Sequence, residues 1–123
     1  MKIRIKGNSI RLRLTKTDVQ NLKKSGSVEE TTIIGNQQVF KYALIIDSDK
    51  PQLSASLSDN KITVYLSKKE AVIITDTDEI TITGSQKNGQ EADLFLLVEK
   101  DLECLDTTFE DQSDMYKNTK TNC

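Results

Sequence analysis

Alternating apolar and charged residues at the start of the chain predict a β-hairpin, and a second hairpin follows 52 positions later. The first spans residues 2–14 and turns at Gly7-Asn8, a pair that suits a two-residue turn. The second spans residues 53–66 and turns at Asp59-Asn60. Because side chains alternate between the two faces of a strand, each hairpin has one apolar face to bury. The chain is therefore expected to form a β-rich fold with two similar halves.

The similarity between the halves continues beyond the hairpins without a gap. Aligning residues 2–49 with residues 54–101 gives nine identical pairs in 48 positions, and the apolar positions largely stay apolar. Such self-similarity indicates two copies of one supersecondary unit. We therefore expect one domain, residues 1–103, made of two repeats, 1–50 and 51–103.

A helix is expected after each hairpin. A hydroxyl residue followed three positions later by an acid forms a capping box, and both halves have one: Thr15 with Asp18, and Ser67 with Glu70. The first helix is expected over about residues 16–25, with Gly26 as its stop. The second contains a β-branched run, residues 72–75, that suits a strand. The repeat is the reason for expecting a helix there.

Two further strands are expected in each half, at residues 28–34, 38–46, 79–84 and 93–100. Each half then reads β-β-α-β-β, and one such unit alone buries too little surface to be stable. The sequence predicts an α+β fold, mainly β, in which two tandem duplicated units complete one barrel as a pseudo-dimer within a single chain. Residues 104–123 hold acids and few apolar residues, so an acidic, partly disordered tail is expected there.

The charges are unevenly distributed along the chain. Residues 1–24 hold eight Lys or Arg and one acid, whereas the remainder holds nine and eighteen, for a net charge of −2. Five of the cations lie on the first hairpin: Lys2, Arg4, Lys6, Arg11 and Arg13. Like charges opposite each other across a ladder are unfavourable unless acids or an anionic ligand lie nearby. The pattern predicts either an anion-binding face or neutralisation by the acidic half of the chain.

Several classes of function have no support in the sequence. The chain has no histidine, P-loop or nucleophile elbow, so no catalytic site is expected. Two cysteines, Cys104 and Cys123, are too few for a structural zinc site and are expected to be thiols, and neither a metal nor a cofactor is predicted. No apolar run is long enough to span a membrane or to form a signal-peptide core. We expect a cytoplasmic protein without membrane partners, either monomeric or homodimeric.

Short stretches of both halves resemble a known family. Gly7-Asn8-Ser9-Ile10-Arg11-Leu12-Arg13-Leu14 is similar to G-N-S-x-x-V-R-I-P, and residues 62–70 with 78–82 are similar to I-V-I-P-K-E, a helix, and G-D-x-V-x-I. These patterns occur in the AbrB-like and MazE-like swapped-hairpin proteins, which are bacterial transition-state regulators and antitoxins. The resemblance implies a swapped-hairpin barrel and DNA contacts from Arg4 and Arg13.

This chain departs from that family where Thr15 and Ser67 replace two prolines. The second hairpin also lacks the cations of the first. The chain as a whole resembles a set of short bacterial proteins of unknown function that begin K-I-R-I-K-G-N-S-I-R and end in an acidic E-D-Q-S-D segment. That second resemblance implies no activity.

The leading hypothesis is a non-enzymatic DNA-binding protein, either a transcription regulator or an antitoxin. Its nucleic-acid contacts are expected from the first hairpin: Lys2, Arg4, Lys6, Asn8, Arg11 and Arg13. The alternative is a protein-interaction module whose basic hairpin is neutralised internally. Its partner is expected to bind the acidic tail: Glu103, Asp106, Glu110, Asp111 and Asp114.

Two further roles stay open. The tail could instead shield the hairpin, since Glu99, Asp101 and Glu103 share a strand face that would meet the arginines if the strands were neighbours. The outer face of the second hairpin is rich in hydroxyl groups, which could suit a sugar-binding protein or a minor enzyme: Ser54, Ser56, Thr63 and Tyr65.

Overall fold

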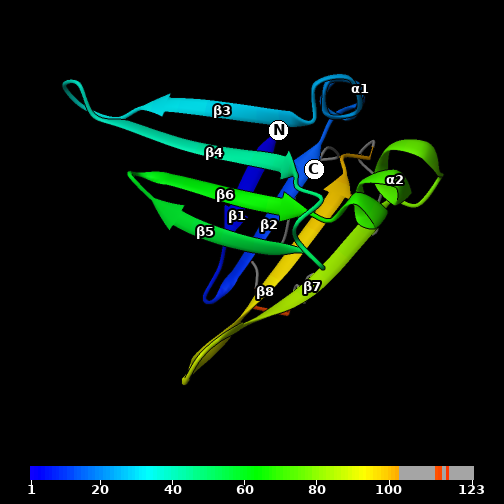
Figure 1. Ribbon diagram of the computed structural model, residues 1–123. Coiled ribbons are helices and arrows are strands. Elements are labelled where there is room, and N and C mark those ends of the chain that lie inside the picture. Colours follow the sequence, from blue (N-terminus) through cyan, green and yellow to red (C-terminus); the bar gives the residue numbers. More distant parts are fainter. Residues whose placement is uncertain (103–112, 115, 117–123) are drawn as a thin grey trace.

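The computed structural model describes residues 1–102, 113, 114 and 116. Its eight strands are β1 (Lys2–Ile5), β2 (Ser9–Leu14), β3 (Ser27–Ile33), β4 (Val39–Ile46), β5 (Ser54–Ser58), β6 (Lys61–Leu66), β7 (Thr81–Asn88) and β8 (Glu91–Lys100). Its helices are α1 (Lys16–Ser25) and α2 (Lys68–Asp76) (Figure 1). The element order β-β-α-β-β therefore occurs twice, and the expectation of an α+β, mainly β fold is confirmed.

The strands form two four-stranded sheets, and each sheet takes one hairpin from each half of the chain. The first sheet has the order β1-β2-β8-β7, and the second has the order β3-β4-β6-β5. In each sheet the two central strands, β2 with β8 and β4 with β6, run parallel, while the outer pairs are antiparallel. In Figure 1 the second sheet lies in front of the first and its strands cross those behind.

The two sheets remain open within the described residues, so the expectation of a closed swapped-hairpin barrel is not confirmed. Strand β5 of the second sheet approaches β7 of the first, but a side chain makes the contact. Gln86 Oε1 accepts a hydrogen bond from Ala55 N at 2.7 Å, and Gln86 Nε2 donates to Ala55 O at 3.1 Å. The side-chain amide thus occupies the main-chain groups that a continuing ladder would use.

Both hairpins have the register that the sequence predicts. Arg4 pairs with Arg11 across the first, and Leu57 pairs with Ile62 across the second. The second turn needs two residues with positive φ, and Asp59 and Asn60 supply them at 52° and 62°. This register places the cations on one face of the first hairpin and the hydroxyl groups on the corresponding face of the second.

Both helices form where they are expected, and both begin with a complete capping box. Gly26 ends α1 in the left-handed region, and its N–H donates to Leu22 O at 2.8 Å. Helix α2 forms despite its β-branched run because it buries Ala71 and Ile74 against the sheets. Packing outweighs the weak local preference for a strand. Both helices lie at the same end of the sheets and contact each other (Figure 1).

The core lies between the inner faces of the two sheets and under both helices. Its most deeply buried side chains come from both halves: Leu12, Leu14, Leu22, Leu44, Leu53, Leu66, Ile74, Leu96, Val64 and Val98. None of the helices in the described part of the chain is long and apolar enough to cross a membrane.

Main-chain hydrogen bonds define how the two halves correspond. Gly26 O accepts from Ile46 N, and Ile80 O accepts from Lys100 N, so the offset between these strands is 54 residues. Up to the helices the offset is 52, as the two capping boxes show. The gap-free alignment is therefore wrong from residue 77 onward, because the second half has two extra residues before β7. A shift of two residues leaves every strand side chain on the same face, so alternation could not reveal it.

The last hairpin also differs from the expectation. Strands were expected at 79–84 and 93–100, but β7 continues to Asn88 and β8 begins at Glu91. A register irregularity between Gln86 and Asn88 lets the ladder continue to the tip. This hairpin therefore extends well away from the core (Figure 1).

Candidate functional site

The outer face of the first sheet gathers the cations of the first hairpin beside side chains of β8. Parallel pairing sets Arg13 next to Glu99, Arg11 next to Leu97, and Ser9 next to Phe95. Across the β1–β2 ladder, Lys2 lies opposite Arg13 and Arg4 opposite Arg11. The face thus has three successive rows, from an ion-paired end to an aromatic end.

Glu99 neutralises two of these cations. It is only 2% exposed, and its Oε1 lies 2.5 Å from Arg11 Nη2 and accepts a hydrogen bond from Arg11 Nε at 2.6 Å. Arg13 Nε lies 3.0 Å from the same oxygen, an ion pair in which the N–H is not aligned for a hydrogen bond. Asp101 adds a second acid, 3.1 Å from Lys2 Nζ and 3.6 Å from Arg13 Nη2. The strands are neighbours, so Glu99 and Asp101 do meet Arg11 and Arg13, whereas Glu103 lies outside the described residues.

A hollow of about 200 Å³ lies at the other end of this face, and we call it the basic hollow. It combines cationic, apolar and hydroxyl side chains: Arg4, Lys6, Ser9, Ile10, Arg11, Phe95 and Leu97. Phe95 is 48% exposed, which is high for an aromatic side chain on a sheet face. Phe95 and Leu97 were not among the predicted site residues. Alternation along 93–100 puts them on the face of Glu99, but only the pairing of β8 with β2 brings them to the cations.

Asn8, the remaining predicted contact of the first hairpin, takes part in holding the fold together. Its Nδ2 donates to Ala92 O at 3.2 Å and to Asp93 O at 2.8 Å. These bonds fix the β1–β2 turn against the start of β8.

The predicted tail residues fall mostly outside the described part of the chain. Those outside it are Glu103, Cys104, Asp106, Glu110, Asp111 and Cys123. Asp114 is described and lies exposed in a turn. The proposed roles of the tail as a partner-binding segment or as a shield stay predictions.

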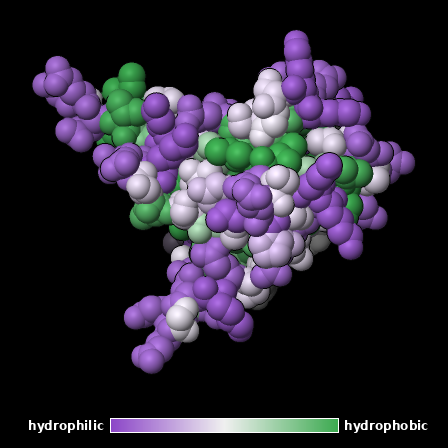
Figure 2. Space-filling view, viewed as in Figure 1, coloured by the Kyte–Doolittle hydropathy of each residue, from purple (hydrophilic) through white to green (hydrophobic). Residues whose placement is uncertain are grey.

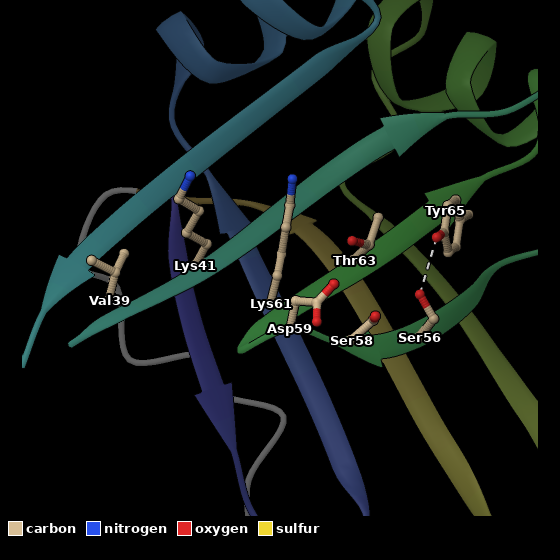
Figure 3. A pocket seen from close by; sticks show the side chains of 8 residues that line it. All are labelled: Val39, Lys41, Ser56, Ser58, Asp59, Lys61, Thr63 and Tyr65. Atoms are coloured by element: carbon tan, nitrogen blue, oxygen red, sulfur yellow. Dashed lines mark hydrogen bonds between the residues drawn. The ribbon is translucent and has the colours of Figure 1, made fainter. Parts of the chain in front are cut away.

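A second hollow, of about 450 Å³, lies on the outer face of the second sheet, and we call it the hydroxyl hollow. It is lined by four hydroxyl groups, two lysines, an acid and a valine: Val39, Lys41, Ser56, Ser58, Asp59, Lys61, Thr63 and Tyr65 (Figure 3). Ser56 Oγ and Tyr65 Oη hydrogen-bond at 3.0 Å. Figure 2 shows that hydrophilic side chains cover most of the face turned to the reader, which includes this sheet. Of the four hydroxyl residues predicted on this face, Ser56, Thr63 and Tyr65 line the hollow and Ser54 does not. Lys41, which comes from β4, was not predicted.

The two hollows occupy equivalent places in the two halves. The offset of 52 residues makes Lys61 the counterpart of Ser9, and the offset of 54 makes Lys41 the counterpart of Phe95. Ser9 lies next to Phe95 in the parallel ladder of the first sheet, and Lys61 lies next to Lys41 in that of the second. Phe95 N donates to Asn8 O, and Lys41 N donates to Asn60 O, both at 3.0 Å. The same backbone frame therefore carries an arginine-rich aromatic hollow on one sheet and a hydroxyl-rich hollow on the other.

Glu29 pairs with one lysine of the hydroxyl hollow and lies near the other. Lys61 Nζ lies 2.5 Å from Glu29 Oε1, and Lys41 lies directly opposite Lys61 in the ladder. The hydrogen bond from Lys61, with the nearby charges of both lysines, holds the pKa of Glu29 below its ordinary value of 4.5. Within the described part of the chain, Lys41 forms no ion pair of its own.

Another charged cluster anchors the start of the chain. The Met1 amine lies 2.8 Å from both Asp18 Oδ2 and Glu30 Oε2, and Tyr42 Oη donates to Met1 O at 2.9 Å. Burial works to lower the pKa of the Met1 amine and to raise that of Asp18. The hydrogen bonds between these groups outweigh burial, so the pKa of the amine is raised and that of Asp18 is lowered. Burial, with the negative charges of Glu30 and Asp18, raises the pKa of Tyr42.

Among the described residues, no three acids or cysteines converge as metal ligands. Comparison with curated proteins finds no match, and comparison with solved structures finds none either. The resemblance to the AbrB-like swapped-hairpin proteins is therefore not confirmed. The family model that does match covers residues 1–120, nearly the whole chain. The expectation of a set of proteins without assigned activity is confirmed: the chain belongs to the family of unknown function DUF7009.

Proposed function

We propose that this protein is a non-enzymatic module that binds single-stranded nucleic acid on the outer face of its first sheet. The observation that carries the proposal is the basic hollow, where half-exposed Phe95 lies among Arg4, Lys6 and Arg11. Aromatic side chains on a sheet face stack unpaired bases, while neighbouring cations attract the phosphates. The proposal keeps Arg4, Lys6 and Arg11 among the contacts expected from the first hairpin and adds Phe95 as the base contact.

The ion pairs favour single strands over duplex DNA. Glu99 and Asp101 neutralise much of the charge of Lys2, Arg11 and Arg13, which leaves fewer cations for the many phosphate contacts that duplex binding uses. A duplex also hides the faces of its bases, whereas a single strand presents them to Phe95. A swapped-hairpin mode of DNA binding, as in the AbrB-like proteins, is a finer version of the proposal that rests on the sequence resemblance alone.

Fluorescence anisotropy with a labelled oligothymidylate, and with a duplex of equal length, tests the proposal. We expect the full chain to bind the single strand more tightly, and the affinity to fall as salt rises from about 50 to about 200 mM. Phe95→Ala should weaken binding about 5- to 100-fold through lost stacking. Arg4→Ala should reduce the slope of log affinity against log salt by about one. Tighter binding to the duplex would remove the single-strand claim.

A control cation on the same sheet does not line the basic hollow. Lys87 on β7 is exposed and paired with Asp93 at 2.7 Å. Lys87→Ala should leave the affinity nearly unchanged. If Arg4→Ala, Phe95→Ala and Lys87→Ala all behave alike, any binding is a general effect of charge and the basic hollow is not the site.

A second candidate is a protein-interaction module, and the ion pairs of Glu99 and Asp101 favour it. Lys2, Arg11 and Arg13 have acidic partners inside the fold, as the alternative hypothesis requires. In that case the acidic segment engages the partner. Its test is a pull-down with the full chain and with a variant whose tail acids are neutralised: Glu103→Gln, Asp106→Asn, Glu110→Gln, Asp111→Asn and Asp114→Asn. Identical partner sets for both chains count against this candidate, and a gain in oligothymidylate affinity by the variant indicates shielding.

A further inference from the structure

The hydroxyl hollow on the second sheet shares no lining residue with the proposed nucleic-acid site, and its chemistry points to another ligand. We propose that it binds an anionic sugar, a small molecule with several ring hydroxyl groups and one phosphate or carboxylate. The proposal does not depend on the proposed function, because the two hollows lie on different sheets. The volume of the hydroxyl hollow, about 450 Å³, is within the range of small-molecule sites.

The hydroxyl groups supply the contacts that a sugar ring needs. Ser56, Ser58, Thr63 and Tyr65 come from two adjacent strands and line the same hollow, and Asp59 adds a carboxylate acceptor (Figure 3). Hydroxyl groups both donate and accept, so they can match ring hydroxyl groups in several orientations. Thr63 is 9% exposed, which places its hydroxyl group deep in this face.

The lysines supply the site for the anionic group. Lys41 and Lys61 lie opposite each other on adjacent strands and reach in the same direction (Figure 3). Such a pair is unfavourable without a counter-charge, and Glu29 pairs with Lys61 alone at 2.5 Å. Within the described residues Lys41 has no ion pair of its own, so an anion bound beside it would supply one.

The same features separate this ligand from a nucleic acid. The counterpart of Phe95 is Lys41, so the hydroxyl hollow lacks the exposed aromatic side chain that stacks a base. Tyr65, its aromatic residue, has Lys50 Nζ 4.8 Å from the ring centroid and uses its hydroxyl group on Ser56. A hydroxylated anion matches the available groups better than a base does.

An NMR titration of the ¹⁵N-labelled full chain tests the proposal with defined probes. Glucose 6-phosphate and glucuronate should each shift the amide signals of residues 58–65 and 39–43, and should leave those of residues 4–11 unmoved. The two probes distinguish a phosphate from a carboxylate as the preferred anion. Glucose alone and inorganic phosphate alone should bind at least tenfold more weakly. Equal affinity for inorganic phosphate would reduce the site to a simple anion contact and overturn the assignment, as would unmoved signals with both sugar acids.

Two substitutions and one control locate the binding. Lys41→Met removes the cation and Thr63→Val removes a hydroxyl group at constant shape, and each should weaken glucose 6-phosphate binding at least fivefold. The control, Lys87→Met, removes an exposed lysine of the first sheet and should have no effect. The spectrum of each variant reports its folding directly. Unchanged affinity in both folded variants would contradict the proposal.

Discussion

The outer faces of the two sheets occupy equivalent positions in the repeat but differ in charge. In the first sheet, the partly exposed Arg11 and Arg13 pair with the buried carboxylate of Glu99. Their counterparts in the second sheet are Thr63, Tyr65 and Ile45, which form a neutral surface. At these three positions the first sheet has two cations with an acid, and the second sheet has neither the cations nor the acid. The most conspicuous charge pattern of the sequence is thus largely a feature of the fold, and the candidate binding residues lie in the neighbouring rows.

The largest expected effect comes from making the first face resemble the second at one position only. Glu99→Ile removes a buried carboxylate, only 2% exposed, that pairs with both Arg11 and Arg13. Breaking a buried ion pair by removing one partner typically costs 3–5 kcal/mol, so we expect the free energy of unfolding to fall by about 3 kcal/mol. Urea denaturation followed by circular dichroism measures it.

The matched control replaces all three charged residues of the first sheet with their uncharged counterparts from the second sheet. The triple change Arg11→Thr, Arg13→Tyr and Glu99→Ile should recover most of the stability, because it removes the charges together with their partner. The equivalence of the two faces is refuted if the triple variant is no more stable than Glu99→Ile alone.

A smaller loss of stability is expected at a position where the two halves have different residues, Gly84 in the second and Glu30 in the first. Gly84 lies under buried Leu53, whose Cβ would be 3.1 Å from a new Cβ. At the equivalent position of the first half, Glu30 reaches the Met1 amine instead. Gly84→Ala should cost about 1–2 kcal/mol, since crowding of a fixed neighbour exceeds the gain from a stiffer unfolded chain. A higher thermal unfolding temperature for this variant would contradict the prediction, because it would mean that Leu53 moves enough to accommodate the new methyl group.

The smallest expected effect concerns the two capping acids. Asp18 accepts from Thr15 N and from the Met1 amine, whereas its counterpart Glu70 accepts from Ser67 N and from the uncharged amide of Leu53. Asp18→Asn should cost about 1 kcal/mol at neutral pH, and Glu70→Gln should cost less because its second donor is neutral. Chemical denaturation at several pH values compares them.

The pH dependence sharpens this comparison. The pKa of Asp18 is lowered from 3.8 in the fold, so its stabilisation is complete above that value and is lost as the pH falls through the folded-state pKa. The pKa of the Met1 amine is raised from 8.0, so its share is complete below pH 8 and is lost as the pH rises through the folded-state value. The cost of Asp18→Asn should therefore shrink at both extremes. A cost that stays constant from acid to alkaline pH would mean that the carboxylate charge contributes nothing.

Much of the local structure could be predicted from the sequence. The hairpin registers follow from alternation and from turn residues, and both helix starts follow from their capping boxes. Helix α2 could be predicted only through the repeat, because its β-branched run has the wrong local preference and packing decides the outcome.

The pairing between the two halves could not be predicted in the same way. Alternation places Phe95 and Glu99 on one face of a strand, but it does not show which strand lies alongside. The two extra residues before β7 keep every strand side chain on the same face, so alternation does not reveal them. Alternation could place Ser56, Thr63 and Tyr65 on the face of the hydroxyl hollow. It could not place Lys41 there, because Lys41 reaches the hollow only through the parallel pairing of β4 with β6.

The central claim is that two equivalent faces have diverged in what they bind. An NMR titration of the full chain with oligothymidylate tests it most directly, because each face reports through its own amide signals. We predict that residues 4–11 and 95–97 shift while residues 41 and 61–65 do not. Shifts of similar size on both faces, or on neither, would contradict the claim.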